Sequence, residues 1–207
     1  MFMPNAQSYL AVNYDAVGAG LVNIAGGSPY TFSHTASSGT YAVLTLYAGA
    51  FSGSPTTVTY GGISMSSLGS IALGSGSGLY MYGLANVPGG AQTISITTSG
   101  NVLLGMAQSV SYSNVVSVSA ATTSSGTSTT PSIGPISCTR GQVVVCGLAS
   151  SAGGTVNMKW PMGGINRYLA QATHTALEIS DCAATMTFSA TINSNGWGGI
   201  GVVLKPT

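Results

Sequence analysis

Few residues in this chain could support acid–base chemistry, and two of them lie close together. The acids are Asp15, Glu178 and Asp181, and the histidines are His34 and His174. Glu178 and Asp181 could form the paired carboxylates of a glycoside hydrolase. Their odd spacing would direct them to opposite faces of an extended strand, and we expect Asp181 to lie in a turn instead.

Other catalytic patterns are weaker. A Ser/His/Asp triad is possible by composition, but the chain has no G-x-S-x-G elbow to carry one. His174 near Glu178 resembles a metal pair, yet two ligands do not make a zinc site. The Gly/Ser run at residues 74–78 lacks the lysine of a phosphate loop. We therefore predict no catalytic residues, no metal and no cofactor, and expect a protein that is not an enzyme.

A group of cationic and aromatic residues is the best candidate for binding. Lys159, Trp160, Arg167 and Tyr168 flank the pair Gly163-Gly164. Such aromatic side chains can stack on a sugar or enter a pocket of a partner protein. Alternatively, Trp160 folds back and closes one end of the domain, because aromatic residues are mostly buried.

The three cysteines match no zinc-binding spacing. Cys138 and Cys146 could meet across a hairpin, whereas Cys182 lies far along the chain. Isolated cysteines in strands usually behave as small buried hydrophobic residues. We expect free thiols.

The scarcity of charge restricts the possible partners. Charged residues make up 3% of the 207 residues, against about 25% in typical proteins, and residues 16–139 carry no formal charge. This excludes a basic surface for nucleic acid. It also suggests a surface covered by neighbours in a permanent assembly, although a hydroxyl-rich surface hydrated by water is the alternative.

The chain shows no membrane or export signal. Gly, Ser and Thr interrupt every apolar stretch, so no run of about 20 apolar residues exists. Residues 1–8 have neither a basic nor an apolar region of the kind found in signal peptides. We expect no membrane insertion and no secretion through a signal peptide.

Short alternating segments separated by turn residues predict an all-β protein. Polar and apolar residues alternate at 30–34, 91–98, 185–192 and 197–204, among others. Residues 41–47 are apolar on both faces, as in a central strand. The pattern predicts a single antiparallel β-sandwich domain over residues 1–207, of jelly-roll type, with an up-and-down barrel as the alternative. The Ser/Thr-rich residues 120–130 are expected to form a loop.

The strongest local signal is a hairpin centred on Gly61-Gly62. Alternating residues flank this pair, and a two-residue hairpin turn requires positive φ, which glycine tolerates. Tyr60 should then face Ile63 across the turn, and Val58 should face Met65. These four side chains are predicted to line one buried face.

Several phrases together resemble a protein family. They are YDAVGAG (14–20), TFSHT (31–35), VTYGGISM (58–65), LANVPGGAQTI (84–94), SVSYSNV (109–115) and WGGIGVVLKP (197–206). In this order they resemble small minor tail proteins of tailed phages that infect mycobacteria and related actinobacteria. Residues 120–164 match least.

This resemblance implies a non-enzymatic virion component that is assembled in the host cytoplasm. Its expected partners are other virion proteins and further copies of itself, and a host cell-surface glycan is possible. Capsid decoration is an alternative role within the virion. A carbohydrate-binding module that recognises cell-wall glycans is an alternative of a different class.

Overall fold

The computed structural model describes residues 10–49, 54–74, 76–155, 164–193 and 196–206. Within these ranges every regular element is a β-strand, and every pairing between two strands is antiparallel. The same ranges contain no helix long and apolar enough to cross a membrane. The prediction of an all-β antiparallel protein is confirmed.

The strands form four sheets. Sheet A contains β1 (Asn13–Val17), β2 (Leu21–Gly26), β4 (Tyr41–Gly49), β7 (Ser66–Gly74), β8 (Ser77–Leu84) and β10 (Val102–Ser113). Sheet B contains β3 (Tyr30–Ala36), β5 (Pro55–Tyr60), β6 (Ile63–Ser64) and β9 (Gly90–Thr98). Sheet C contains β11 (Ser117–Val118), β12 (Thr122–Gly126), β14 (Val143–Thr155), β15 (Ile165–Cys182) and β17 (Gly196–Lys205). Sheet D contains β13 (Ser132–Ile136) and β16 (Met186–Ser189).

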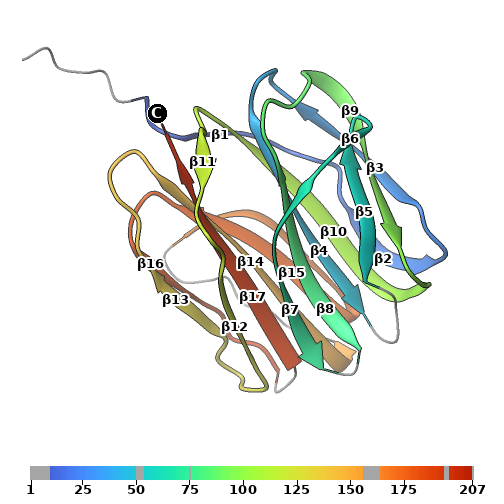
Figure 1. Ribbon diagram of the computed structural model, residues 1–207. Coiled ribbons are helices and arrows are strands. Elements are labelled where there is room, and N and C mark those ends of the chain that lie inside the picture. Colours follow the sequence, from blue (N-terminus) through green and yellow to red (C-terminus); the bar gives the residue numbers. More distant parts are fainter. Residues whose placement is uncertain (1–9, 50–53, 75, 156–163, 194–195, 207) are drawn as a thin grey trace, which may run out of the picture.

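The sheets stack in the order B, A, C, D (Figure 1). Each gap is filled by side chains from both flanking sheets: Phe32 and Leu44 between B and A, Val110 and Val202 between A and C, and Phe188 and Val144 between D and C. The first half of the chain therefore builds sheets A and B, and the second half builds C and D.

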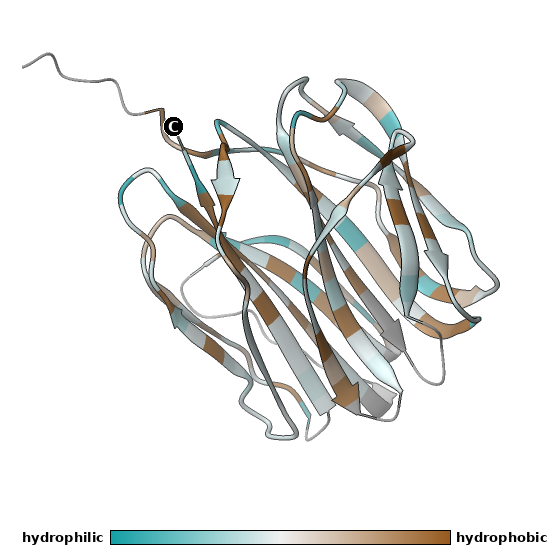
Figure 2. Ribbon diagram, in the orientation of Figure 1, coloured by the Kyte–Doolittle hydropathy of each residue, from teal (hydrophilic) through white to brown (hydrophobic). Residues whose placement is uncertain are grey.

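Sheets A and C are buried on both faces. In β4, Leu44 packs toward sheet B while its neighbour Val43 packs toward sheet C, and both are fully buried. This confirms that residues 41–47 form a central strand. Hydrophobic residues accordingly occur along strands in every layer, and strongly hydrophilic ones are few (Figure 2).

The structure is more layered than the single two-sheet sandwich expected from the sequence. Four sheets are present, and the jelly-roll type stays a prediction. The loop expected at 120–130 contains strand β12, which pairs with β17. This difference arises because ladder hydrogen bonds use only backbone groups, so a Ser/Thr-rich segment can pair with a glycine-rich strand despite its polarity.

The hairpin at Gly61-Gly62 forms as predicted, with one exception. Both glycines have positive φ, at 56° and 81°, and Tyr60 pairs with Ile63. Val58, Tyr60 and Met65 are buried, but the side chain of Ile63 is 48% exposed. The prediction that Ile63 is buried is wrong, because β6 is only two residues long and Ile63 lies beside the exposed turn.

Replacing Gly62 tests the turn. An added Cβ would meet nothing within 4 Å, so any cost must come from the positive φ. We expect Gly62→Val to lower the free energy of unfolding by about 1–3 kcal/mol. Gly62→Asn should cost less, because asparagine tolerates the left-handed region. Thermal melts compare the two variants, and equal destabilisation would contradict the turn assignment.

A close approach between sheets C and D depends on Gly201. A Cβ at this position would lie 2.3 Å from Cδ1 of Ile136, and the next Ile136 atom would be 3.8 Å away. Ile136 is buried in the core between the two sheets. Only a residue without a side chain therefore lets Ile136 reach the backbone of β17.

We expect Gly201→Ala to lower the free energy of unfolding by about 1–3 kcal/mol through overpacking. Ile136→Val removes the clashing Cδ1 and should by itself cost about 0.5–1.5 kcal/mol. The double variant should be more stable than Gly201→Ala alone. Gly27→Ala is the matched control, because its new Cβ would meet only Asn101, at 3.4 Å. Chemical denaturation measures all four, and simple additivity of the two costs would refute the proposed contact.

Candidate functional site

The three carboxylates lie one at each gap between sheets; Glu178 and Asp181 are buried, and Asp15 is partly exposed. Asp15 belongs to a cluster between sheets A and B, Asp181 to one between A and C, and Glu178 to one between C and D.

The cluster between sheets A and B is a chain of hydrogen bonds centred on His34. Nδ1 of His34 lies 2.6 Å from Oγ of Ser109, and Nε2 lies 3.1 Å from Oγ of Ser111. Ser111 donates to Oδ2 of Asp15 at 2.7 Å, and the backbone N–H of Ser37 donates to the same oxygen. His34 is 1% exposed.

This order of bonds fixes the direction of each proton. Since Ser111 donates to Asp15, its oxygen accepts from the Nε2–H of His34, and Ser109 then donates to Nδ1. Burial lowers the pKa of His34, and the nearby Asp15 offsets this only in part. Burial raises the pKa of Asp15, but the hydrogen bonds from Ser111 and Ser37 outweigh it, so the pKa is below its ordinary value.

The cluster has the residue types of a nucleophilic site but no room for a substrate. Ser109 is fully buried, and the backbone of Gly18 lies against its hydroxyl, where an added Cβ would be 2.5 Å from Oγ. His34 could have been placed in the core from sequence, because it shares one face with Tyr30 and Phe32. Its partners are about 75 positions away and had no local signal.

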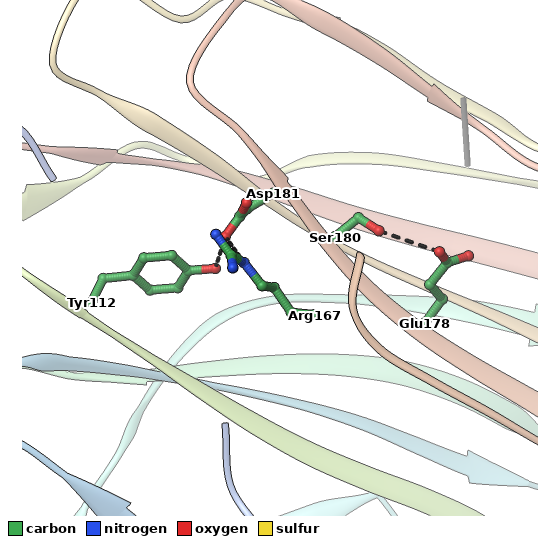
Figure 3. Close-up of polar contacts among 5 residues, drawn as sticks. All are labelled: Tyr112, Arg167, Glu178, Ser180 and Asp181. Carbon is green, nitrogen blue, oxygen red and sulfur yellow. Dashed lines mark hydrogen bonds and ion pairs between the residues drawn. The ribbon is translucent and has the colours of Figure 1, made fainter. Parts of the chain in front are cut away.

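The cluster between sheets A and C joins an ion pair to a buried tyrosine (Figure 3). Nε of Arg167 lies 2.7 Å from Oδ2 of Asp181, and the hydroxyl of Tyr112 donates to the same oxygen at 2.8 Å. The guanidinium also lies over the ring of Tyr14, 3.9 Å from its centroid. Burial and the neighbouring Asp181 raise the pKa of Tyr112. The cluster therefore holds sheet C against sheet A.

The ion pair also reveals the path of β15. Arg167 and Asp181 are 14 positions apart in this element. A straight strand would separate them by about 45 Å, so the chain must reverse direction between them. Asp181 is in the strand and 2% exposed, so the expectation that it lies in a turn is wrong.

Glu178 occupies a small cavity between sheets C and D. The cavity is lined by Cys146, Leu148, Glu178, Ser180, Phe188 and Ser189. Oε1 of Glu178 accepts hydrogen bonds from Asn166 at 2.5 Å and from Ser180 at 3.2 Å. Oε2 has no partner among the described residues. Burial raises the pKa of Glu178 to about 7, although these two hydrogen bonds lower it.

Glu178 and Asp181 point away from each other, because the segment that carries both is extended. Figure 3 shows Glu178 with Ser180 in one group and Asp181 with Tyr112 and Arg167 in another. The two carboxylates lie on opposite faces of sheet C. In this arrangement they do not flank a common substrate bond.

The predicted binding residues are only partly within the described ranges. Lys159 and Trp160 lie outside them, as does the side chain of His174. Arg167 is held in the ion pair with Asp181, and Tyr168 packs against the core between sheets A and C. The structure thus gives Arg167 and Tyr168 internal contacts, and their proposed role in binding stays a prediction.

The three cysteines are free thiols, as predicted. Burial raises the pKa of Cys146 far above its ordinary value, with a further contribution from Glu178. Cys138 and Cys182 are partly exposed. Among the described residues, no group of three or more His, Cys, Asp or Glu side chains could hold a metal ion.

The buried carboxyl of Glu178 should make stability depend on pH. Its pKa is about 7 in the folded protein, against an ordinary value of 4.5, so the folded state binds the proton more tightly than the unfolded state. The stabilisation is therefore complete below pH 4.5 and is lost as pH rises toward 7, by roughly 3 kcal/mol.

Glu178→Gln keeps an oxygen acceptor for Asn166 and Ser180 but cannot ionise. We expect the unfolding free energy of wild type to fall relative to that of Glu178→Gln as pH rises from 4.5 to 7. Urea denaturation at several pH values measures this difference. A constant difference over this interval would show that Glu178 titrates normally.

Comparison with known proteins adds no relative. No family model, no curated protein and no solved structure matches this chain.

Proposed function

We propose that this protein is a non-enzymatic structural component of a tailed-phage virion, a minor tail protein that works as a homo-oligomer among other virion proteins. The observation that carries this proposal is the placement of the charged side chains. All three acids accept hydrogen bonds from other residues, Glu178 and Asp181 are buried, and Arg167 is paired with Asp181. The outside is left with almost no charge to keep copies apart.

The outer face of sheet B supports contact with neighbours. Apart from the exposed Ala91, the outward-facing residues are mostly hydroxylated: Thr31, Ser33, Thr35, Thr57, Thr59, Thr93, Ser95 and Thr97. The edge strand β3 carries no lysine or acid, although exposed edges are commonly protected by such charges. A face without charge suits a protein whose neighbours cover it.

The strand order of sheets A and B favours the jelly-roll type. The pairs β1–β10, β3–β9, β4–β8 and β5–β6 are nested, one inside the next, around the Gly61-Gly62 turn. A rolled-up hairpin of eight strands in two sheets has this nesting. Jelly rolls are common in viral capsid and lectin domains, which agrees with a virion role and leaves glycan binding possible.

The family phrases include the residues on which this half of the fold depends. YDAVGAG contains Asp15 and Gly18, TFSHT contains His34, and SVSYSNV contains Ser109 and Ser111. These residues meet in one buried cluster. The phrases that resemble actinobacteriophage minor tail proteins are far apart in the sequence, but some of their residues therefore lie close together in the structure. A place on the capsid, or contact with host glycans, is an alternative for the same kind of component.

Light scattering on the purified protein tests the assembly. We expect an oligomer. Thr93→Glu should lower its association constant at least tenfold, because the substitution places a charge on the outer face of sheet B. Thr187→Glu is the matched control, an exposed threonine of sheet D. Quantitative mass spectrometry of purified virions should find many copies per particle. A monodisperse monomer at high concentration, together with absence from virions, would refute the proposal.

A further inference from the structure

Cys182 faces the gap between sheets C and D. It is the cross-strand partner of Val144 in the ladder between β15 and β14. Cross-strand partners project from the same face of a sheet. Val144 belongs to the core between sheets C and D, and Cys182 packs against that core.

Cys138 reaches the same place from sheet D. It follows β13, and its backbone N–H donates to Oγ1 of Thr185 at 2.9 Å, while that hydroxyl donates to the carbonyl oxygen of Cys138 at 3.2 Å. Thr185 lies three positions after Cys182. Cys138 packs against the core that contains Val144, the cross-strand partner of Cys182. The two cysteines therefore lie against the same core between sheets C and D.

We propose that Cys138 and Cys182 form a reversible disulfide that ties the end of β13 to the end of β15. Both residues are partly exposed, so a small disulfide such as oxidised glutathione can reach them. The thiolate of one cysteine attacks that disulfide and releases one glutathione. The thiolate of the other then attacks the mixed disulfide and releases the second. Two protein thiols are oxidised by two electrons, and oxidised glutathione is reduced to two thiols.

This bond would strengthen the attachment of sheet D. Sheet D has only two short strands, and it closes over the cavity that holds Glu178. A crosslink restricts the unfolded chain and so stabilises the folded one. The cytoplasm keeps such thiols reduced, whereas the bond can form in an oxidising exterior. The inference stands on the positions of the cysteines and does not depend on the proposed function.

Mass spectrometry of the wild-type protein tests the proposal directly. After incubation with oxidised glutathione, we expect the intact mass to fall by two hydrogen atoms. A non-reducing peptide map should show Cys138 linked to Cys182 and Cys146 as a free thiol. A link that includes Cys146, a crosslink between two molecules, or glutathione that remains attached to either cysteine would each overturn the proposal.

Variants provide the controls. Cys138→Ser and Cys182→Ser should each abolish the loss of mass, whereas Cys146→Ser, which removes the buried thiol, should retain it. Oxidation should raise the melting temperature of wild type and of Cys146→Ser, and reduction should reverse this. Unchanged melting after complete formation of the Cys138–Cys182 link would contradict the stabilising role. Because the peptide map uses wild type, the test holds even where a variant folds poorly.

Discussion

The structure depends on the burial of sheets A and C on both faces. A sheet with a second sheet on each side has no water-facing surface, so its strands must carry side chains that pack in two directions. Val43 and Leu44 meet this requirement from adjacent positions of β4. Close packing between sheets also requires small residues, as Gly201 shows beneath Ile136. The apolar strands and the many glycines of the sequence follow from this arrangement.

Polar residues inside such a stack must find partners, because a buried polar group without one is costly. His34 achieves this through two serines and Asp15, and Asp181 through Tyr112 and Arg167. Among the described residues, one oxygen of Glu178 has no partner, and neither do the buried hydroxyls of Thr45 and Thr175. A carboxyl in the position of Glu178 holds its proton more tightly, which makes it the pH-sensitive point of the stack.

The placement of acids between the sheets connects the fold with the proposed role. Acids that serve as partners inside the stack are not available to make the outside repulsive. On the outer face of sheet B most of the side chains that point outward carry hydroxyl groups. Such a surface suits permanent contact with neighbouring proteins, which is what a virion component requires.

The sequence by itself determined most strands and the turn at Gly61-Gly62, because alternation and turn chemistry are local properties. The spacing of Glu178 and Asp181 places them on opposite faces only if the segment is extended, and the structure shows that it is. Only the tertiary structure decided that four sheets stack, that Ile63 is exposed, and that Arg167 meets Asp181 after the chain reverses. Periodicity states which face of a strand is apolar, but the partner of that face is selected by packing between segments far apart in the chain.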